Sequence, residues 1–249
     1  MIFPFTTQPA TFLERPNRYR IVAQLHETQQ IVNAHCPDPG RLRELLIPSA
    51  MVHISNASHS ERKTAYDLRF VEHPEHGQLV SLDTRLPNQI FGEGLVSGFF
   101  APFRGHQAMQ REKPLPHAPT DGGVHSRIDY HIIDAEGRPC WIEVKSASLV
   151  EERCARFPDA VTARGRRHVL ELAAMAQAGI RTAVVFIIQR PDADLLRPQW
   201  STDPDFGHAL VAAQAAGVEI YAYTCILTLR EVYLANAIPI VLNIDTLFT

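Results

Sequence analysis

The sequence predicts a two-domain fold of mixed α/β (α+β) class, in which a small β-barrel or meander precedes an α/β domain with a mixed central sheet. The first third consists of short alternating segments separated by turn formers, whereas the second half alternates strand and helix patterns. The chain has 249 residues and 45% hydrophobic content, which suits one large domain or two small ones. We place the domains at residues 1–83 and 84–249.

The first domain is predicted from period-two alternation of apolar and polar residues, the pattern of half-buried strands. The segments are "RYRIVAQL", "QQIVNAH", "AMVHIS", "YDLRFVE" and "QLVSL". Turn formers such as Pro37, Pro39, Gly40 and Gly77 separate them. One short helix is predicted at "GRLRELL", directly after the Asp-Pro-Gly turn.

The second domain opens with a weaker helical pattern. Asn88 is a candidate N-cap for a helix through "QIFGEGLVS" that ends at Gly98. Gly92 and Gly94 oppose this helix, since each costs ~1 kcal/mol relative to alanine. The stretch from Phe100 to Gly123 is rich in Pro, Gly and His and is predicted as a loop around one short strand near "HQAMQRE".

From Val124 onward the pattern is regular. Strands are predicted at "HSRIDYHII", "CWIEVKS", "TAVVFII" and "VEIYAYTCI", and helices at about 162–178 and 204–216, stopped by Gly179 and Gly217. The first two strands form a hairpin. The later alternation of strand and helix requires right-handed crossovers, and therefore a sheet with parallel members and helices on its faces.

Charge is unevenly distributed along the chain, although the formal net charge is only -3. Between Arg15 and Arg43 five arginines stand against two acids, and between Arg153 and His168 five stand against one. The chain after Pro191 carries seven acids against two arginines. This asymmetry permits the basic face that a phosphate backbone needs, and scattered solvated arginines remain an open alternative.

Neither export nor membrane insertion is indicated. The chain does not start with a basic region followed by an apolar core, and no run approaches the ~18 apolar residues of a membrane span. The cysteines Cys36, Cys140, Cys154 and Cys225 lie far apart and form no C-x-x-C pair, which argues against a zinc knuckle and a disulfide framework. We therefore expect a cytoplasmic protein without a membrane partner.

Candidate catalytic residues lie on the two strands of the predicted hairpin. In "SRIDY" Asp129 lies opposite the apolar side chains, and in "WIEVK" Glu143 and Lys145 do the same. Neighbouring carboxylates stay ionised together most easily around a divalent cation, and Mg²⁺, or Mn²⁺ in its place, suits carboxylates, waters and phosphate oxygens. Lys145 adds a charge that orients an attacking water or stabilises the phosphate. Glu93, on the upstream helix, is a candidate third ligand.

Spacing alone leaves a second interpretation open. Asp and Glu-x-Lys at alternating strand positions also occur as solvated faces and cross-strand salt bridges. Other site types find no support, because the sequence contains no phosphate-binding loop, dinucleotide fingerprint or nucleophile elbow. His168 and Glu171 fall one helical turn apart, but without an H-E-x-x-H frame they do not define a zinc site.

Several longer segments, taken in order, carry a family resemblance. They are "RPNRYRIVAQL", "AHCPDPGRLRELLIP", "RKTAYDLRFVE", "SLDTRLPN", "SRIDYHI", "IEVKSASLV", "FPDAVTARGRRHVLELAAMAQAG", "FIIQRPDAD" and "DPDFGHALVAAQAAGVEIYAY". In these segments, from about Arg15 to Tyr223, the chain closely resembles the sugar fermentation stimulation protein family, SfsA. The resemblance implies an N-terminal OB-fold domain and a C-terminal domain similar to PD-(D/E)xK nucleases (restriction-endonuclease-like), with affinity for DNA of no strong sequence preference.

The resemblance also implies roles for individual residues. Asp129 matches the motif aspartate, Glu143 the acidic position and Lys145 the lysine, while Glu93 matches an acidic helix position after the "LPN" segment. The chain departs from the nuclease pattern in carrying Ile128 where a proline can precede the aspartate. It departs from the family tendency at the two glycines that flank Glu93.

Candidate DNA contacts lie in both domains. OB barrels bind single strands through a basic groove with aromatic platforms, which makes Arg18, Tyr19, Arg20, Arg41 and Arg43 candidates. In the second domain, the candidates are the three arginines at the start of the predicted helix, Arg164, Arg166 and Arg167. Positive charge at a helix start opposes the macrodipole, and a phosphate would relieve that conflict.

Two functions follow from these observations. The first is a Mg²⁺-dependent phosphodiesterase acting on DNA, with Asp129 and Glu143 on the metal, Glu93 as a third ligand and Lys145 beside the attacking water. The second is a DNA-binding regulator linked to sugar (maltose) metabolism that keeps the nuclease-like fold without turnover. DNA is the expected partner in both, and the three residues of the motif favour the first.

Overall fold

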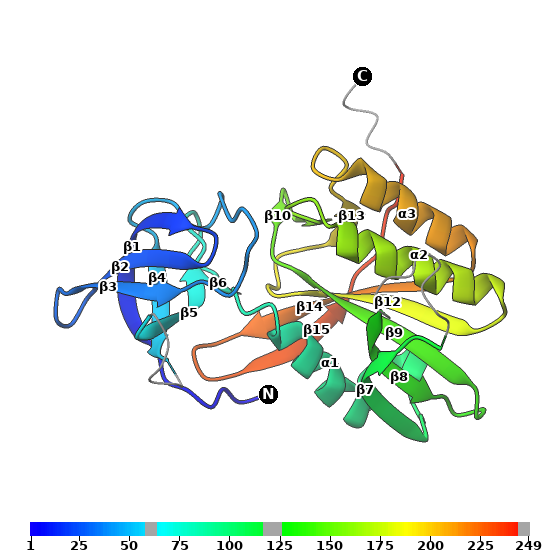
Figure 1. Ribbon diagram of the computed structural model, residues 1–249. Helices are drawn as coiled ribbons and strands as arrows, with labels where there is room; N and C mark the ends of the chain where they lie inside the picture. The colour runs from blue at the N-terminus through cyan, green and yellow to red at the C-terminus, as the bar shows by residue number, and fades with distance from the viewer. Residues whose placement is uncertain (58–63, 117–125, 244–249) are drawn as a thin grey trace.

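The first domain is a closed β-barrel. The computed structural model describes residues 1–57, 64–116 and 126–243, and two domains lie side by side in it (Figure 1). The strands of the first are β1 (Gln8–Asn17), β2 (Arg20–Leu25), β3 (Ile31–His35), β4 (Met51–Asn56), β5 (Tyr66–Glu72) and β6 (Leu79–Ser81). They follow the order β3-β2-β1-β4-β5-β6, and a parallel pairing of β3 with β5 at Ala34 and Tyr66 closes the barrel. The predicted barrel is thus confirmed.

Two features of the barrel differ from the sequence prediction. Strand β1 was not predicted, because only Ala10 and Phe12 are buried in it and its alternation is correspondingly short. The helix predicted at "GRLRELL" is wrong, since this segment forms turns. Leu42 there has a φ of 51°, which lies in the left-handed region and ends any right-handed helix.

The second domain is built on a mixed sheet, as predicted. Its order is β15-β14-β12-β9-β8-β7, with β9, β12 and β14 parallel and the remaining neighbours antiparallel. The strands are β7 (Ala108–Pro114), β8 (Arg127–Ile133), β9 (Pro139–Ala147), β12 (Arg181–Ile188), β14 (Glu219–Leu227) and β15 (Val232–Ala237). Strand β12, which is apolar from Ala183 to Ile188, is buried along nearly its whole length because helices cover both faces of the sheet.

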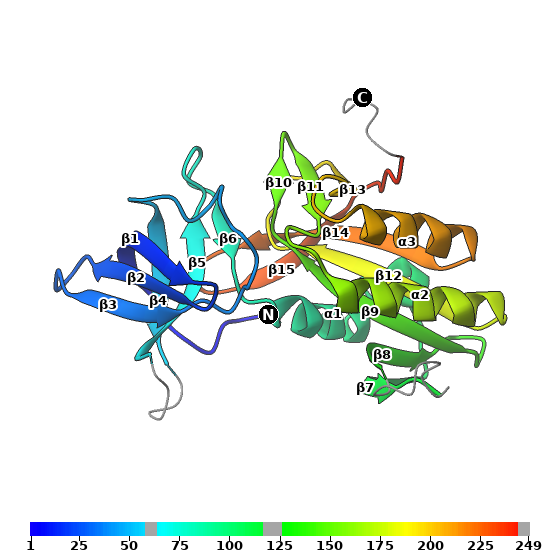
Figure 2. The same cartoon turned by 45° about the horizontal axis from the view of Figure 1, so that its top comes forward.

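Helices cover the two faces unequally (Figures 1 and 2). Helix α1 (Leu86–Val96) lies on one face, and α2 (Ala163–Gln177) and α3 (Pro204–Ala215) lie side by side on the other. Each face has its own apolar core, with Phe91 of α1 in one and Leu172 of α2 in the other. A short 3₁₀ turn, η1 (Ala101–Phe103), follows α1. A small sheet was not predicted: β10 (Val150–Glu151), β11 (Cys154–Phe157) and β13 (Leu195–Pro198).

The glycines of α1 permit a close approach to the sheet. A Cβ on Gly92 would lie 2.5 Å from the Tyr130 hydroxyl, and a Cβ on Gly94 would lie 2.3 Å from Phe100. The Tyr130 hydroxyl donates a hydrogen bond to the backbone carbonyl of Asn88 over 2.6 Å. The two glycines lower the helix propensity of α1, but their lack of a side chain lets the start of α1 pack directly on β8. Asn88 is thereby held against that strand.

The segment before β1 packs on the second domain. The Met1 amine donates to the Val232 carbonyl over 2.7 Å, and Phe3 joins the core on the α1 face. The predicted boundary at residues 83 and 84 lies between β6 and α1. All four cysteines fall within the described ranges and are buried and free of disulfides. None of the helices in these ranges is long and apolar enough to cross a membrane. Part of the predicted loop, residues 117–123, and the first residue of the "HSRIDYHII" strand lie outside them.

Candidate functional site

Strand β9 buries two charged side chains in the middle of the sheet. Glu143 is 4% exposed and Lys145 is 9% exposed. The Lys145 ammonium donates to Oε1 of Glu143 over 2.6 Å. These side chains therefore do not form the solvated strand face that spacing alone left open. Burying an ion pair contributes little to stability, so its presence here points to a functional site.

Asp129 of β8 lies beside this pair. The antiparallel pairing of β8 with β9 extends as far as Tyr130, which lies opposite Ile142. Beyond this pair, Oδ2 of Asp129 accepts a hydrogen bond from the Val144 backbone N–H over 2.8 Å. Oδ1 accepts from the side-chain amide of Asn88 over 2.7 Å. Burial, and after it the neighbouring charge of Glu143, raises the pKa of Asp129 to about 6.

Two side chains, Lys145 and His168, contact the same oxygen of Glu143 and hold its carboxylate ionised. Nδ1 of His168, a buried residue of α2, lies 2.6 Å from Oε1, the same oxygen that accepts from Lys145. Burial alone would favour the neutral acid, but Lys145 and His168 outweigh it and hold the pKa of Glu143 below its usual value. Its second oxygen, Oε2, is buried and has no hydrogen-bond partner among the residues that the structure describes.

The structure does not bring Glu93 to these carboxylates. Glu93 is exposed, and its carboxylate lies 3.2 Å from the Met1 amine. The residue of α1 that reaches the site is Asn88, through Asp129. Asn88 is not the helix cap that the sequence suggested, because α1 begins two residues earlier and Arg85 occupies its N-cap position. The prediction of Glu93 as a third ligand is therefore corrected.

The oxygens of this site fit a hard divalent cation. Glu143 Oε2 and Asn88 Oδ1 are buried without a partner in the part of the chain that the structure describes, and each oxygen of Asp129 retains acceptor capacity. Within that part, no group of three or more His, Cys, Asp and Glu side chains is arranged around one metal position. Two carboxylates suit Mg²⁺, which keeps several waters and completes its shell with substrate phosphate.

The predicted DNA contacts of the barrel are exposed side chains. Arg18, Tyr19, Arg20, Arg41 and Arg43 are all exposed. Arg15 precedes them in the same basic stretch of sequence, but its guanidinium is used in hydrogen bonds within the barrel. Its guanidinium donates to the backbone carbonyls of Arg18 and Arg41, over 2.7 and 3.0 Å, and to two carbonyls of the intervening loop. The Arg15 side chain thus fixes the backbone that presents two of the arginines, Arg18 and Arg41.

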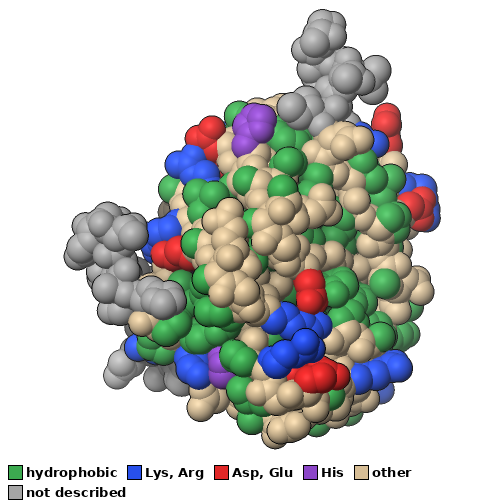
Figure 3. Space-filling view, turned by 90° about the vertical axis from the view of Figure 1, so that its right-hand side faces the viewer, with side chains coloured by type: hydrophobic (Ala, Val, Ile, Leu, Met, Phe, Trp, Pro, Cys, Tyr) green, Lys and Arg blue, Asp and Glu red, His purple; other side chains and the backbone are tan. Residues whose placement is uncertain are grey.

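The arginines at the start of α2 have different surroundings. Arg164 is exposed, Arg166 forms an ion pair with Asp205 in the first turn of α3, and Arg167 lies 3.8 Å from Glu171. Asp205 relieves part of the unfavourable charge at this helix start, which a phosphate was expected to compensate. On the face at the right-hand side of Figure 1, shown in Figure 3, basic and acidic side chains also lie next to one another.

A crevice of about 240 Å³ separates the barrel from the site. Arg18 lines it on the barrel side, and Ser146, next to Lys145 in the chain, lines it on the other. Asp38 and Asp159 also line it, and the pKa of Asp38 is raised to about 6 by burial and then by the Asp159 charge. These acids weaken the crevice itself as a phosphate site, so the predicted attraction to phosphate would depend on the exposed arginines.

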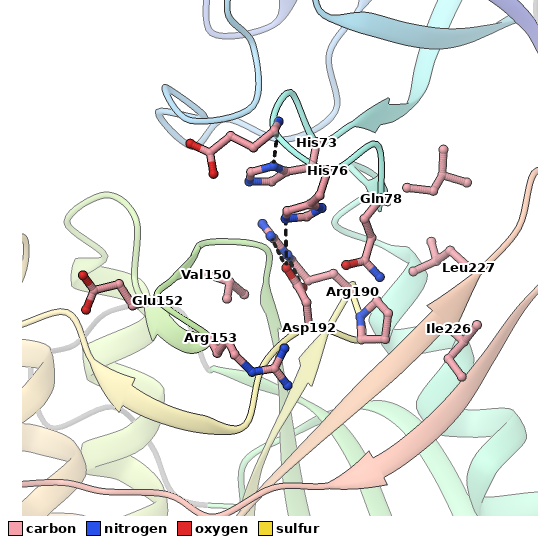
Figure 4. A pocket seen from close by; sticks show the side chains of 13 residues that line it. His73, His76, Gln78, Val150, Glu152, Arg153, Arg190, Asp192, Ile226 and Leu227 are labelled. Carbon is pink, nitrogen blue, oxygen red and sulfur yellow. Dashed lines mark hydrogen bonds and ion pairs between the residues drawn. The ribbon is translucent and has the colours of Figure 1, made fainter.

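A larger cavity, of about 680 Å³, lies between the β5–β6 loop and the ends of β12 and β14 (Figure 4). The rings of His73 and His76 stack at 3.9 Å, and Nε2 of His76 lies 3.6 Å from Asp192. Asp192 also binds the buried guanidinium of Arg190. The contact of His76 with Asp192 links the barrel to the second domain, so this cavity lies at the interface between them.

The fold and the site define a two-domain protein in which a closed barrel precedes a mixed sheet with buried carboxylates. Two family profiles match it: "SfsA N-terminal OB domain" over residues 13–82 and "Sugar fermentation stimulation protein RE domain" over residues 85–231. The chain belongs to the SfsA, or sugar fermentation stimulation protein, family, and its barrel is an OB fold.

Individual relatives cover nearly the whole chain. The sugar fermentation stimulation protein homolog of Moorella thermoacetica is 47% identical over 218 residues, covering 87% of this chain and 88% of that protein. The homolog of Desulforamulus reducens is 40% identical over 231 residues, covering 93% and 91%. The solved structure of Pyrococcus furiosus SfsA in complex with Ca²⁺ is 30% identical, has a TM-score of 0.83 and covers 96% of this chain and 97% of that one.

Proposed function

We propose that this protein binds DNA with little sequence preference and hydrolyses its phosphodiester bonds at a PD-(D/E)xK-type site that uses Mg²⁺ or Mn²⁺. The observation that carries the proposal is the convergence of Asp129 and Glu143 beside Lys145, with Oε2 of Glu143 buried and bare within the described residues. The Ca²⁺ complex of the Pyrococcus furiosus relative supports a divalent cation, because Ca²⁺ and Mg²⁺ both take oxygen ligands.

The residues of the site have separable tasks. Asp129, fixed by Asn88 and by the Val144 N–H, and Glu143, through Oε2, would hold the cation. When bound, the cation would stabilise charge on the phosphate and lower the pKa of a water. In hydrolysis a water oxygen bonds to phosphorus while one ester oxygen leaves with a proton. Lys145 orients that water or stabilises charge on the phosphate.

DNA association would rest on the exposed arginines of both domains. On the barrel, Arg18 and Arg20 flank Tyr19 in the sequence, and Arg41 and Arg43 are also exposed, a set of side chains suited to a backbone with stacked bases. In the second domain Arg164, Arg166 and Arg167 remain candidates, of which Arg164 is exposed and Arg166 would have to exchange Asp205 for phosphate. Ion pairs at an exposed helix start contribute about 0–1 kcal/mol, so this exchange is energetically accessible.

The decisive experiment compares cleavage of single-stranded, double-stranded and branched DNA in Mg²⁺ and in Mn²⁺. The variants are Asp129→Asn and Lys145→Ala, with Glu93→Gln as a matched control at an exposed acid outside the site. We expect cleavage by the wild type and by Glu93→Gln, and loss of at least about 100-fold in the two site variants.

Binding of the same DNA is measured in parallel, because it separates the two functions. DNA that is bound but not cleaved by the wild type would refute hydrolysis and favour the regulator that keeps the fold without turnover. Equal cleavage by the wild type and the site variants would show that another enzyme in the preparation is responsible.

A further inference from the structure

His168 of α2 contacts a carboxylate of the site. It is 3% exposed, and its Nδ1 lies 2.6 Å from Oε1 of Glu143. In the sequence its spacing to Glu171 suggests a zinc pair, but the Glu171 carboxylate accepts a hydrogen bond from Ser126. The contact with Glu143 therefore calls for a different explanation.

The chemistry of the pair fixes the direction of this hydrogen bond. An ionised carboxylate only accepts, and Glu143 is held ionised, so Nδ1 of His168 must carry the proton and donate it. Lys145 donates to the same oxygen. Both donors thus occupy Oε1, and Oε2 keeps its full capacity to bind a cation.

The position of His168 is fixed by the packing of α2. Its neighbour Val169 and Leu172, one turn further on, are fully buried in the core on this face of the sheet. At the start of the helix, the Thr162 hydroxyl accepts from the Gly165 N–H, and the Thr162 N–H donates to Asp203, the cap of α3. A side chain on so well anchored a helix holds its partner in one rotamer.

We propose that His168 is a positioning residue for the divalent cation: by holding Oε1 of Glu143 it turns Oε2 toward the metal position shared with Asp129. The role rests on the cation site proposed above and extends it to the opposite face of the sheet. Asn88 of α1 holds Asp129 from one face, and His168 of α2 holds Glu143 from the other. The two helices thereby set the separation of the two ligands.

The test measures metal affinity in the absence of DNA, by calorimetric titration with Mg²⁺ and Ca²⁺ and by the spin-resonance signal of Mn²⁺. His168→Leu removes the donor, whereas His168→Asn places an amide N–H near the position of Nδ1. Loss of a group that orients a metal ligand typically weakens binding about 10–100-fold, which is the effect expected for His168→Leu. His168→Asn should recover most of that affinity.

His53→Leu is the matched control. His53 is also buried and also bonds a glutamate, Glu72, over 2.8 Å, but it lies in the barrel. Its loss should lower the melting temperature and leave metal affinity unchanged. Unchanged affinity in His168→Leu would overturn the proposal, as would equal losses in the two leucine variants, or an asparagine variant no better than the leucine one.

Failure of the inference is distinguishable from failure of the proposed function. A wild type that binds Mg²⁺ without cleaving DNA would refute hydrolysis, and the comparison of the His168 variants would still decide the positioning role. A wild type that binds none of the three cations would refute the cation site and the positioning role together.

Discussion

Replacing Asp129 by asparagine should stabilise the metal-free protein while it abolishes metal binding. Oδ2 of Asp129 accepts from the Val144 N–H, and Oδ1 accepts from Asn88. An amide in this place keeps the first bond and can donate to Oδ1 of Asn88 once the Asn88 amide turns over. That oxygen has no partner at present among residues 1–57, 64–116 and 126–243. Both hydrogen bonds are retained, and the buried charge is removed.

The magnitude follows from the pKa of Asp129. Burial and the Glu143 charge raise it from 3.8 to about 6, which corresponds to about 3 kcal/mol at about 1.4 kcal/mol for each pH unit. Bonds to a charged acceptor are stronger than those to an amide, so we expect a net gain of about 1–3 kcal/mol. For a chain of this length that raises the melting temperature by roughly 2–12 °C.

The direction in which stability changes with pH provides a control for this experiment. Between about pH 4 and pH 6 the folded wild type binds more protons than the unfolded chain, so its stability falls as the pH rises through this window. Asp129→Asn lacks that loss. Thermal unfolding in a chelator should therefore show the variant ahead at about pH 8 and level with the wild type at about pH 4. A variant less stable at pH 8, or a difference that does not change with pH, would refute this reasoning.

The remaining predictions concern the neighbours of this carboxylate and the barrel surface. Asn88→Ala removes a hydrogen bond that favours ionised Asp129, so the pKa of Asp129 should rise above about 6 in a carboxyl-carbon NMR titration; an unchanged midpoint would contradict this. Lys145→Leu leaves a buried carboxylate without its cation and should destabilise the fold by about 3–5 kcal/mol in urea unfolding, whereas a neutral effect would mean that the ion pair is solvated. Replacing Arg18 and Arg41 together by glutamine should lower the slope of log affinity for DNA against log salt by about 2, and an unaltered slope would remove both from the interface.

The period of apolar residues along the sequence predicted those strands and helices in which that period is regular. The strands β8, β9, β12 and β14 and the helices α2 and α3 carry a clear period, and the structure has them close to the predicted positions. The helix expected at "GRLRELL" failed because long-range contacts decide that segment. Its loop is fixed by the Arg15 guanidinium and by Asp159, which accepts from the Arg41 N–H across the domain boundary.

The candidate site divides in the same way. Asp129, Glu143 and Lys145 were predictable because strand periodicity puts them on the side away from the apolar residues. The burial of Glu143 and Lys145 was not, since it depends on α2 covering β9. Asn88 and His168 were both noticed in the sequence, as a cap and as a zinc candidate, but their real partners lie 41 and 25 residues away. Only the docking of each helix on the sheet selects those partners.

The placement of the carboxylates bears on which of the two functions the site serves. The exposed arginines of the barrel suffice for an attraction to phosphate, and Asp129 and Glu143 oppose it while no cation lies between. A module that only bound DNA would thus be weakened by them, and the fold would also bear the cost of a carboxylate whose pKa is raised to about 6. With a divalent cation in place both penalties reverse, because the cation neutralises the carboxylates and attracts the phosphate. Both donors to Glu143 contact one oxygen, and the other oxygen has no partner within the described residues, which leaves it available to such a cation and supports the hydrolytic function proposed above.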